Sequence, residues 1–193
     1  MTEQVPLRER KKRRAQEAIV DAAYALFAER GFADVTVTEI AERAEVGRTT
    51  FFRYFGDKQE VLFVDERNLL AALLAAPASS ARPPTVREAL EEARELVAMM
   101  CATVTADGHR YRLHEKLVAD NEELHDRSER KLLNLTEAMT GRLAQRGMAA
   151  PEAALAAHVA LACFRAGRAT AGDDPQALGS AVDGAFEALL RDF

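Results

Sequence analysis

Polar and cationic side chains are concentrated in the segment TVTEIAERAEVGRTTFFRYFGDK, which runs from Thr36 to Lys58. Hydroxyl and guanidinium groups are donors with which proteins contact DNA phosphates and read base edges in the major groove. In a helix, at about 100° per residue, Thr49, Thr50 and Arg53 would share one face, opposite an apolar face. The segment therefore predicts a recognition surface for double-stranded DNA.

A helix-turn-helix would position these side chains. Thr36 followed by Glu39 forms a capping box, which begins a first helix. After a break in the apolar pattern, Gly47 is an acceptable N-cap for a second helix that extends to Phe55. Phe51 and Phe55 would lie on its buried face, so its polar face would point outward.

Two cations lie where the helix dipole disfavours them. Arg48 falls in the first turn of the second helix, and Lys58 lies within the Asp57 to Glu60 capping box of the next helix. A bound anion would remove this penalty, because free amide groups at helix N-termini bind phosphates. We therefore predict that Arg48 and Lys58 contact the DNA backbone. The alternative is that both are solvated surface charges.

A second cationic element precedes this unit. Six of the seven residues from 8 to 14, RERKKRR, are Lys or Arg. Such an arm can follow phosphates or enter a minor groove, and it adds salt-dependent affinity with little sequence information. The alternative is a solubilising terminus. The predicted DNA contacts of the arm are Arg10, Lys11, Lys12, Arg13 and Arg14. The arm leads into an amphipathic helix with Ile19, Ala23, Leu26 and Phe27 facing inward.

The segment from Ala15 to Leu62 resembles the TetR (tetracycline-repressor-like) family of bacterial transcriptional regulators. The resemblance rests on AIVDAAYALFAERGF, TVTEIAERAEVGRTTFFRYF and GDKQEVL. It implies contacts in or beside the major groove for Arg48, Thr49, Thr50, Arg53 and Tyr54. It also implies phosphate contacts for Thr36, Thr38 and Lys58.

Two residues depart from the commonest pattern of that family. Gly47 stands where a serine is frequent, and Phe52 stands where a tyrosine hydroxyl often contacts a phosphate. Phe52 offers no hydrogen bond, although its ring can lie against a sugar or a thymine methyl group. We include Phe52 among the residues expected at the DNA.

The composition predicts an all-α protein. The chain has 193 residues, 48% of them hydrophobic, and no long segment alternates with period two. We expect about nine helices in two domains, a basic arm with a helix-turn-helix over residues 1–58 and an effector-binding and dimerisation domain over residues 59–193. The net charge of −5 arises in the second domain, whereas the cations of the first are clustered. This distribution favours specific recognition over a nonspecific, nucleoid-type DNA binder.

The second domain is predicted to consist of long helices. A single helix from Asp57 to Ala75 would connect the domains, and the segment APASSARPP would form a surface loop. Thr85 and Glu88 form another capping box. A helix follows at about residues 86–105 and ends at Asp107-Gly108. A short helix passes through Tyr111 and Val118, and longer helices follow at about residues 121–146, 151–171 and 175–191, with Gly147 as a natural stop.

The resemblance also implies a small-molecule effector held between these helices. Flexible methionines could repack around an apolar ligand. His109, Arg110, Arg112 and His114 could meet an anionic head group, or could form a solvated helix face. The candidate effector-binding residues, each of which could equally be ordinary core, are Leu96, Met99, Met100, Thr103, Tyr111, Leu132, Leu135, Met139 and Phe164.

The last two helices are implied to form a four-helix bundle with those of a second copy of the chain. A twofold homodimer would read a pseudo-palindromic operator with two half-sites. The alternative is that this apolar surface belongs to the monomer's own core. The predicted interface residues are Leu155, Val159, Ala162, Ala166, Leu178, Val182, Phe186 and Leu189.

Other functional classes find little support in the sequence. The four histidines form no HExxH pair, and no phosphate-binding glycine loop or nucleophile elbow is present, so we expect neither an enzyme nor a cofactor or metal. Cys101 and Cys163 are expected to be buried free thiols, and an oxidation sensor is the alternative. With neither a secretory signal nor a membrane span in the sequence, we expect a cytoplasmic protein.

These observations predict a one-component transcriptional regulator, a repressor that an apolar or amphipathic small molecule releases from its operator. Two alternatives remain. One is a nonspecific DNA binder without an effector, and the other is a protein whose second domain docks a protein partner through an exposed apolar patch.

Overall fold

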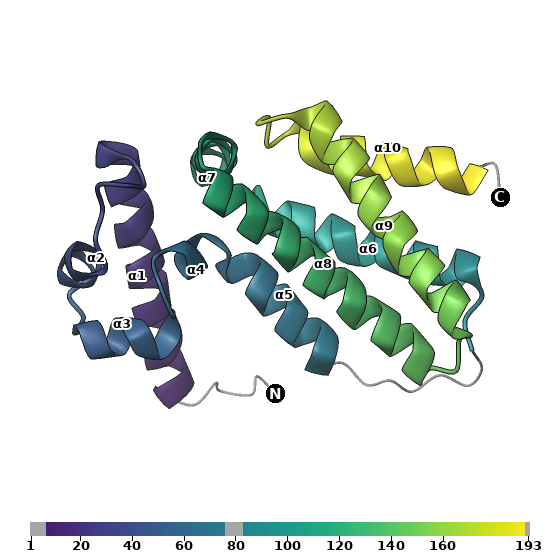
Figure 1. Cartoon of the computed structure of the whole chain (residues 1–193), viewed down its shortest axis with the longest axis horizontal. Helices are drawn as coiled ribbons and strands as arrows, with labels where there is room; N and C mark the ends of the chain where they lie inside the picture. The colour runs from purple at the N-terminus through teal and green to yellow at the C-terminus, as the bar shows by residue number, and fades with distance from the viewer. Residues whose placement is uncertain (1–6, 76–82, 192–193) are drawn as a thin grey trace. The chain divides into compact units, whose positions relative to one another are not determined.

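The fold is entirely helical. A computed structural model describes residues 7–75 and 83–191, which form ten α-helices and no β-strand (Figure 1). The prediction of an all-α fold is thereby confirmed, while most of the predicted APASSARPP loop lies outside the described residues. In chain order the helices are α1 (Leu7–Arg30), α2 (Val37–Arg43), α3 (Arg48–Tyr54), α4 (Gln59–Leu62), α5 (Val64–Ala75), α6 (Val86–Val104), α7 (Gly108–Asp120), α8 (Glu122–Gln145), α9 (Ala150–Ala171) and α10 (Ala177–Arg191).

The predicted single helix from Asp57 to Ala75 is wrong, because two helices occupy this stretch. Phe63, with φ −105° and ψ 28°, ends α4, and α5 begins at the next residue. The Phe63 side chain is fully buried. A stretch that was expected to form one helix therefore contains a backbone break at a buried side chain. This split accounts for ten helices where about nine were expected.

The chain divides into two compact units, one ending at Val64 and the other beginning at Asp65. The predicted domain boundary, after Lys58, lies six residues before this division. In the first unit α1 packs against α2 and α4, and α2 packs against α3. The predicted inward positions of α1 are confirmed as core, with at most 6% of any side chain exposed. They are Ile19, Ala23, Leu26 and Phe27.

In the second unit α9 is the central helix and packs against α6, α8 and α10 (Figure 1). Gly167 of α9 allows the closest approach, because a Cβ atom at this position would lie 2.4 Å from the Val182 Cα atom of α10. An ion pair also joins α10 to α6, because the Arg94 guanidinium donates two hydrogen bonds to the Asp183 carboxylate. These contacts fix α10 on its own chain.

This packing corrects part of the predicted dimer interface. Leu178, Val182 and Phe186 are at most 2% exposed and belong to the core of the second unit. The apolar stripe of α10 faces α6 and α9 of the same chain, so it is not available to a second copy. The other predicted interface residues remain at least partly exposed. They are Leu155, Val159, Ala162, Ala166 and Leu189.

Within the described ranges, no helix combines the length and the apolar character that crossing a membrane requires.

Candidate functional site

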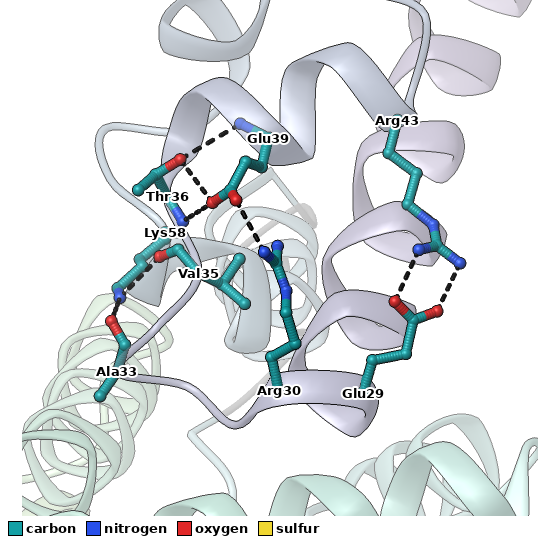
Figure 2. A network of polar contacts seen from close by, with 8 residues as sticks. All are labelled: Glu29, Arg30, Ala33, Val35, Thr36, Glu39, Arg43 and Lys58. Carbon is teal, nitrogen blue, oxygen red and sulfur yellow. Dashed lines mark hydrogen bonds and ion pairs between the residues drawn. The ribbon is translucent and has the colours of Figure 1, made fainter.

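The first helix of the helix-turn-helix begins at the predicted capping box. The Glu39 amide donates to Thr36 Oγ1 at 3.3 Å, and the Thr36 amide and hydroxyl donate to Glu39 Oε2 at 2.8 and 2.7 Å (Figure 2). These hydrogen bonds, with that from Arg30, lower the pKa of Glu39 to about 2. The Thr36 hydroxyl proton is therefore already used within the domain. A phosphate contact by this hydroxyl would require it to leave Glu39.

Two ion pairs hold α2 against α1. Arg30 lies 2.7 Å from the Glu39 carboxylate, and Arg43 lies 2.7 Å from that of Glu29 (Figure 2). Both pairs are largely exposed, so each contributes at most about 1 kcal/mol. Their geometric effect is to hold the ends of α2, the helix that positions the turn before α3.

The turn between α2 and α3 is tight. Glu45 adopts a positive φ of 54°, and the Val46 amide donates to the Ala41 carbonyl at 2.9 Å. Gly47, with φ −72° and ψ 150°, is the N-cap of α3, as predicted. Its carbonyl accepts hydrogen bonds from the Thr50 and Phe51 amides. The turn thus sets the angle at which α3 leaves α2.

α3 presents one buried and one exposed face. Phe51 and the following Phe55 are at most 1% exposed. Arg48, Thr49 and Arg53 are exposed, whereas Thr50 and Tyr54 are half-buried. The periodicity argument is therefore confirmed for the orientation of this helix.

The two flanks of α3 carry aromatic rings. The Phe52 side chain is 48% exposed and meets the buried Phe51 ring edge-on at 5.6 Å. On the other flank, the Arg53 guanidinium lies 5.0 Å from the centre of the Tyr54 ring. Phe52 therefore offers an apolar surface beside the polar face, and Arg53 rests on an aromatic support.

Lys58 has a structural role in the first unit. Its ammonium group donates to three main-chain carbonyls, those of Phe32 at 2.7 Å, Ala33 at 3.2 Å and Val35 at 2.8 Å (Figure 2 shows the last two). These three acceptors match the three protons of an ammonium group. Lys58 therefore fastens the start of α4 to the α1–α2 connection, and a phosphate contact by Lys58 stays a prediction. Only tertiary packing brings these distant residues together.

The basic segment of residues 8–14 also differs from the predicted arm. It forms the first two turns of α1, which begins at Leu7. Arg10, Lys11, Lys12, Arg13 and Arg14 are all exposed. Arg13 lies 3.5 Å from the Glu17 carboxylate one turn later. Because the helix distributes these cations around its axis, they do not form an extended strand that could lie along a groove.

The second unit contains an apolar cavity between α5, α6, α8 and α9, with a volume of about 60 Å³. Six of the nine predicted effector-binding residues line it. They are Leu96, Met100, Leu132, Leu135, Met139 and Phe164. The cavity is further lined by Leu69, Leu73, Val97, Thr136, Ala157, Ala160 and Leu161.

Three predicted effector residues lie elsewhere. Met99 is 60% exposed, and the exposed Thr103 donates its hydroxyl proton to the Met99 carbonyl at 2.9 Å. Tyr111 is buried in the core, and its hydroxyl lies 3.3 Å from the Gly172 carbonyl. Met99 and Thr103 face outward because the opposite face of α6 packs against the core. None of these three residues lines the cavity, and their contact with an effector stays a prediction.

The α5 wall of the cavity, formed by Leu69 and Leu73, was not among the predicted effector-binding residues. Leu69 and Leu73 were treated as part of a connecting helix, although their spacing of four residues indicates a common face. The polar atom of Thr136 is already satisfied, because its hydroxyl donates to the Leu132 carbonyl at 2.9 Å. The remaining lining side chains are apolar, so the wall favours an apolar body.

Comparison with known proteins finds related transcriptional regulators. Residues 19–63 match the model of "Bacterial regulatory proteins, tetR family". The transcriptional regulator TcmR of Streptomyces glaucescens is 43% identical over 77 residues, which are 37% of this chain and 34% of TcmR. The regulator HbdR of Aromatoleum sp. (strain CIB) is 40% identical over 52 residues, 27% of this chain and 23% of HbdR. Residues 19–63 therefore form a DNA-binding domain of the TetR type, with the helix-turn-helix described above.

Solved structures extend the likeness in fold to the second unit. SmeT in complex with triclosan superposes with a TM-score of 0.60 at 20% identity, over 92% of this chain and 90% of SmeT. A regulator from Aquifex aeolicus gives a TM-score of 0.55 at 16% identity, over 93% and 99% of the two chains. At these identities the likeness concerns the fold. The sequence matches to TcmR and HbdR span about a third or less of those proteins.

Both cysteines, Cys101 and Cys163, are buried free thiols, as predicted. Burial raises the pKa of Cys101 to about 11 and that of Cys163 above its usual value. A reactive thiol requires an exposed, stabilised thiolate, so neither cysteine has the environment of an oxidation sensor.

Proposed function

We propose that this protein is a homodimeric repressor that binds a pseudo-palindromic operator through α3 and leaves it when a small apolar or amphipathic molecule occupies the cavity of the second unit. The observation that carries the proposal is the combination of an exposed cationic face on α3 with an apolar cavity in a separate unit. The first unit serves as the DNA-binding domain, and the second serves as the effector-binding and dimerisation domain. Such a regulator acts in the cytoplasm, where its operator lies.

Recognition of DNA rests on the exposed side chains of α3. Arg53 and Thr49 reach base edges in the major groove, with Thr50 and Tyr54 at the flanks. Arg48, in the first turn, pairs with a phosphate beside the free amides of the helix N-terminus. Phe52 lies against a sugar or a thymine methyl group. Thr36 and Thr38, together with the cations of the first turns of α1, contribute backbone contacts.

Dimerisation is supported by the surface of α9. Leu155 is 55% exposed, and the small side chains of Ala162 and Ala166 are exposed farther along the helix. Small residues permit a close approach of two helices, and a twofold arrangement would present two copies of α3 to two half-sites. Val159 and Leu189, which are partly exposed, would extend this interface.

Release by an effector would require the cavity to expand. Its volume of about 60 Å³ is well below the roughly 300 Å³ or more of pockets that hold small-molecule ligands. A ligand must therefore displace the walls, and Met100 and Met139 can adapt by changing rotamers. Because Leu69 and Leu73 belong to α5, which follows the first unit directly in the chain, expansion would move α5 and change the spacing of the two DNA-binding domains. SmeT, whose structure contains triclosan, is a repressor with the same fold.

The test is selection of bound sequences from random DNA by the purified protein at moderate salt. An enriched palindrome with two half-sites is expected for a dimeric regulator. Salt-sensitive binding without enrichment would contradict specific recognition and favour a nonspecific binder. An enriched single half-site would contradict the dimer while leaving recognition by α3 intact. The enriched sequence then serves as the probe for ligand-induced release.

A further inference from the structure

A carboxyl group lies on the same face of α5 as the cavity wall. Glu66 precedes Leu73 by seven residues, which is two helical turns, and precedes Leu69 by almost one turn. Both leucines line the cavity, and Glu66 is partly buried. The α5 face that borders the cavity therefore continues, one turn toward the N-terminus, into a carboxyl group.

The neighbouring helices α8 and α9 each place one cation near Glu66. Lys131 of α8 and Arg168 of α9 are the two cations whose charges act on the Glu66 carboxylate. Lys131 precedes the lining residue Leu135 by one turn, and Arg168 follows the lining residue Phe164 by one turn. Glu66, Lys131 and Arg168 thus form a charged layer that lies about one turn from lining residues of α5, α8 and α9.

Arg168 is already engaged within this layer. Its guanidinium donates two hydrogen bonds to the Glu115 carboxylate, at 2.9 and 3.1 Å. Burial raises the pKa of Glu66 to about 7, with Asp65 adding to the shift, although Lys131 and Arg168 act in the opposite direction. The surrounding charges therefore do not compensate for removing this carboxylate from water. A cation placed beside it would supply the missing compensation.

We propose that the effector is an amphipathic cation, whose ammonium-type end pairs with Glu66 and whose apolar body lies between Leu69, Leu73 and Phe164. This inference rests on the proposed function, because it assigns the chemical class of the ligand for the same cavity. An anionic head group is disfavoured, since it would bring a second negative charge beside Glu66. An uncharged head group would forgo the ion pair.

The dimensions of the walls set the length of the apolar body. Lys131 and Met139 are separated by eight residues of α8, or about 12 Å along the helix axis. An extended alkyl chain of medium length therefore suits the space once the walls have moved apart. The charged end would remain beside Glu66, while the tail would reach Met139, which also lines the cavity.

Three probes of equal chain length, decylamine, decanol and decanoate, test the head group. Their binding to the full-length protein is measured by calorimetry below the concentration at which each probe forms micelles. The same titrations are made with Glu66→Gln, which keeps the side-chain shape and removes the charge. Asp65→Asn is the matched control, because it removes the neighbouring carboxylate from the adjacent face of α5.

We expect the wild type and Asp65→Asn to bind decylamine about tenfold more tightly than decanol, and decanoate most weakly. Glu66→Gln should bind decanol as the wild type does and should lose the preference for the amine. Equal binding of all three probes, tightest binding of decanoate, or a preference retained in Glu66→Gln would overturn the inference while leaving the cavity as an effector site. Failure of all three probes to bind would overturn the inference and, with it, the effector step of the proposed function.

Discussion

The Lys58 ammonium group lies 2.7 Å from the carbonyl oxygen of Phe32 and 4.4 Å from the centre of the Phe32 ring. The same cation therefore binds the end of the α1–α2 connection through both a main-chain oxygen and an aromatic face. Hydrogen bonds from a charged group are among the stronger ones in proteins, and a cation over an aromatic ring adds to them.

Lys58→Met should destabilise the first unit by about 2 kcal/mol, because it keeps the aliphatic stem and removes the three charge-assisted hydrogen bonds. Urea unfolding followed by circular dichroism measures the change. Lys11→Met, at an exposed position of α1, is the control and should leave the unfolding midpoint almost unchanged. If Lys58→Met instead kept full stability and lost affinity for all DNA sequences, Lys58 would be a phosphate contact after all.

Arg53→Ala and Arg48→Ala should affect DNA binding in different ways. If Arg53 reads a base, its removal costs about 1–3 kcal/mol on the selected operator and relaxes the preference at one position. If Arg48 holds a phosphate, its removal weakens all sequences by a similar factor and flattens the salt dependence. Titrations of operator and random DNA at several salt concentrations separate the two patterns. Equal losses on both DNAs for Arg53→Ala would refute its assignment to a base.

Gly167→Ala should destabilise the second unit severely, by more than about 3 kcal/mol, because the added methyl group would lie 2.4 Å from the Val182 backbone. Relief of this clash requires α9 and α10 to separate. Gly141→Ala in the exposed face of α8 is the matched control, since its Cβ atom would meet nothing within 4 Å. That change should stabilise the protein by roughly 0.5–1 kcal/mol through helix propensity. Unfolding midpoints of the two variants should therefore move in opposite directions.

Glu66 should make stability fall as the pH rises. Its pKa in the folded protein is about 7, raised from 4.5, so the unfolded chain ionises first. The stability associated with protonated Glu66 is fully present below pH 4.5 and is lost as the pH rises through about 7, by at most about 3 kcal/mol.

Glu66→Gln removes this dependence, so its melting temperature relative to that of the wild type should be higher at pH 8 than at pH 5. Asp65→Asn provides the comparison, because burial also raises the pKa of Asp65, although Arg110 opposes that shift. A difference between Glu66→Gln and the wild type that does not change with pH would show that Glu66 ionises normally in the folded protein.

Local signals in the sequence were sufficient for most of the helices and for the orientation of α3. The capping boxes at Thr36 and Thr85 formed as predicted, because both partners lie within one turn of each other. Phe51 is buried and Arg53 is exposed because helical periodicity alone separates the two faces. The break at Phe63 was not predictable, since no glycine or proline marks it and its cause is the burial of the ring.

The sequence by itself therefore determined most of the helices, the helix-turn-helix and the family of the DNA-binding domain, because capping, periodicity and a long family motif are encoded in neighbouring residues. Tertiary structure alone decided which partner each apolar or charged face meets. In the tertiary structure Lys58 donates to carbonyls that precede α2, and Phe186 lies in the core of its own chain. Leu69 lines the wall of the cavity. Periodicity shows that a face is apolar, but only the packing of distant segments decides what covers it.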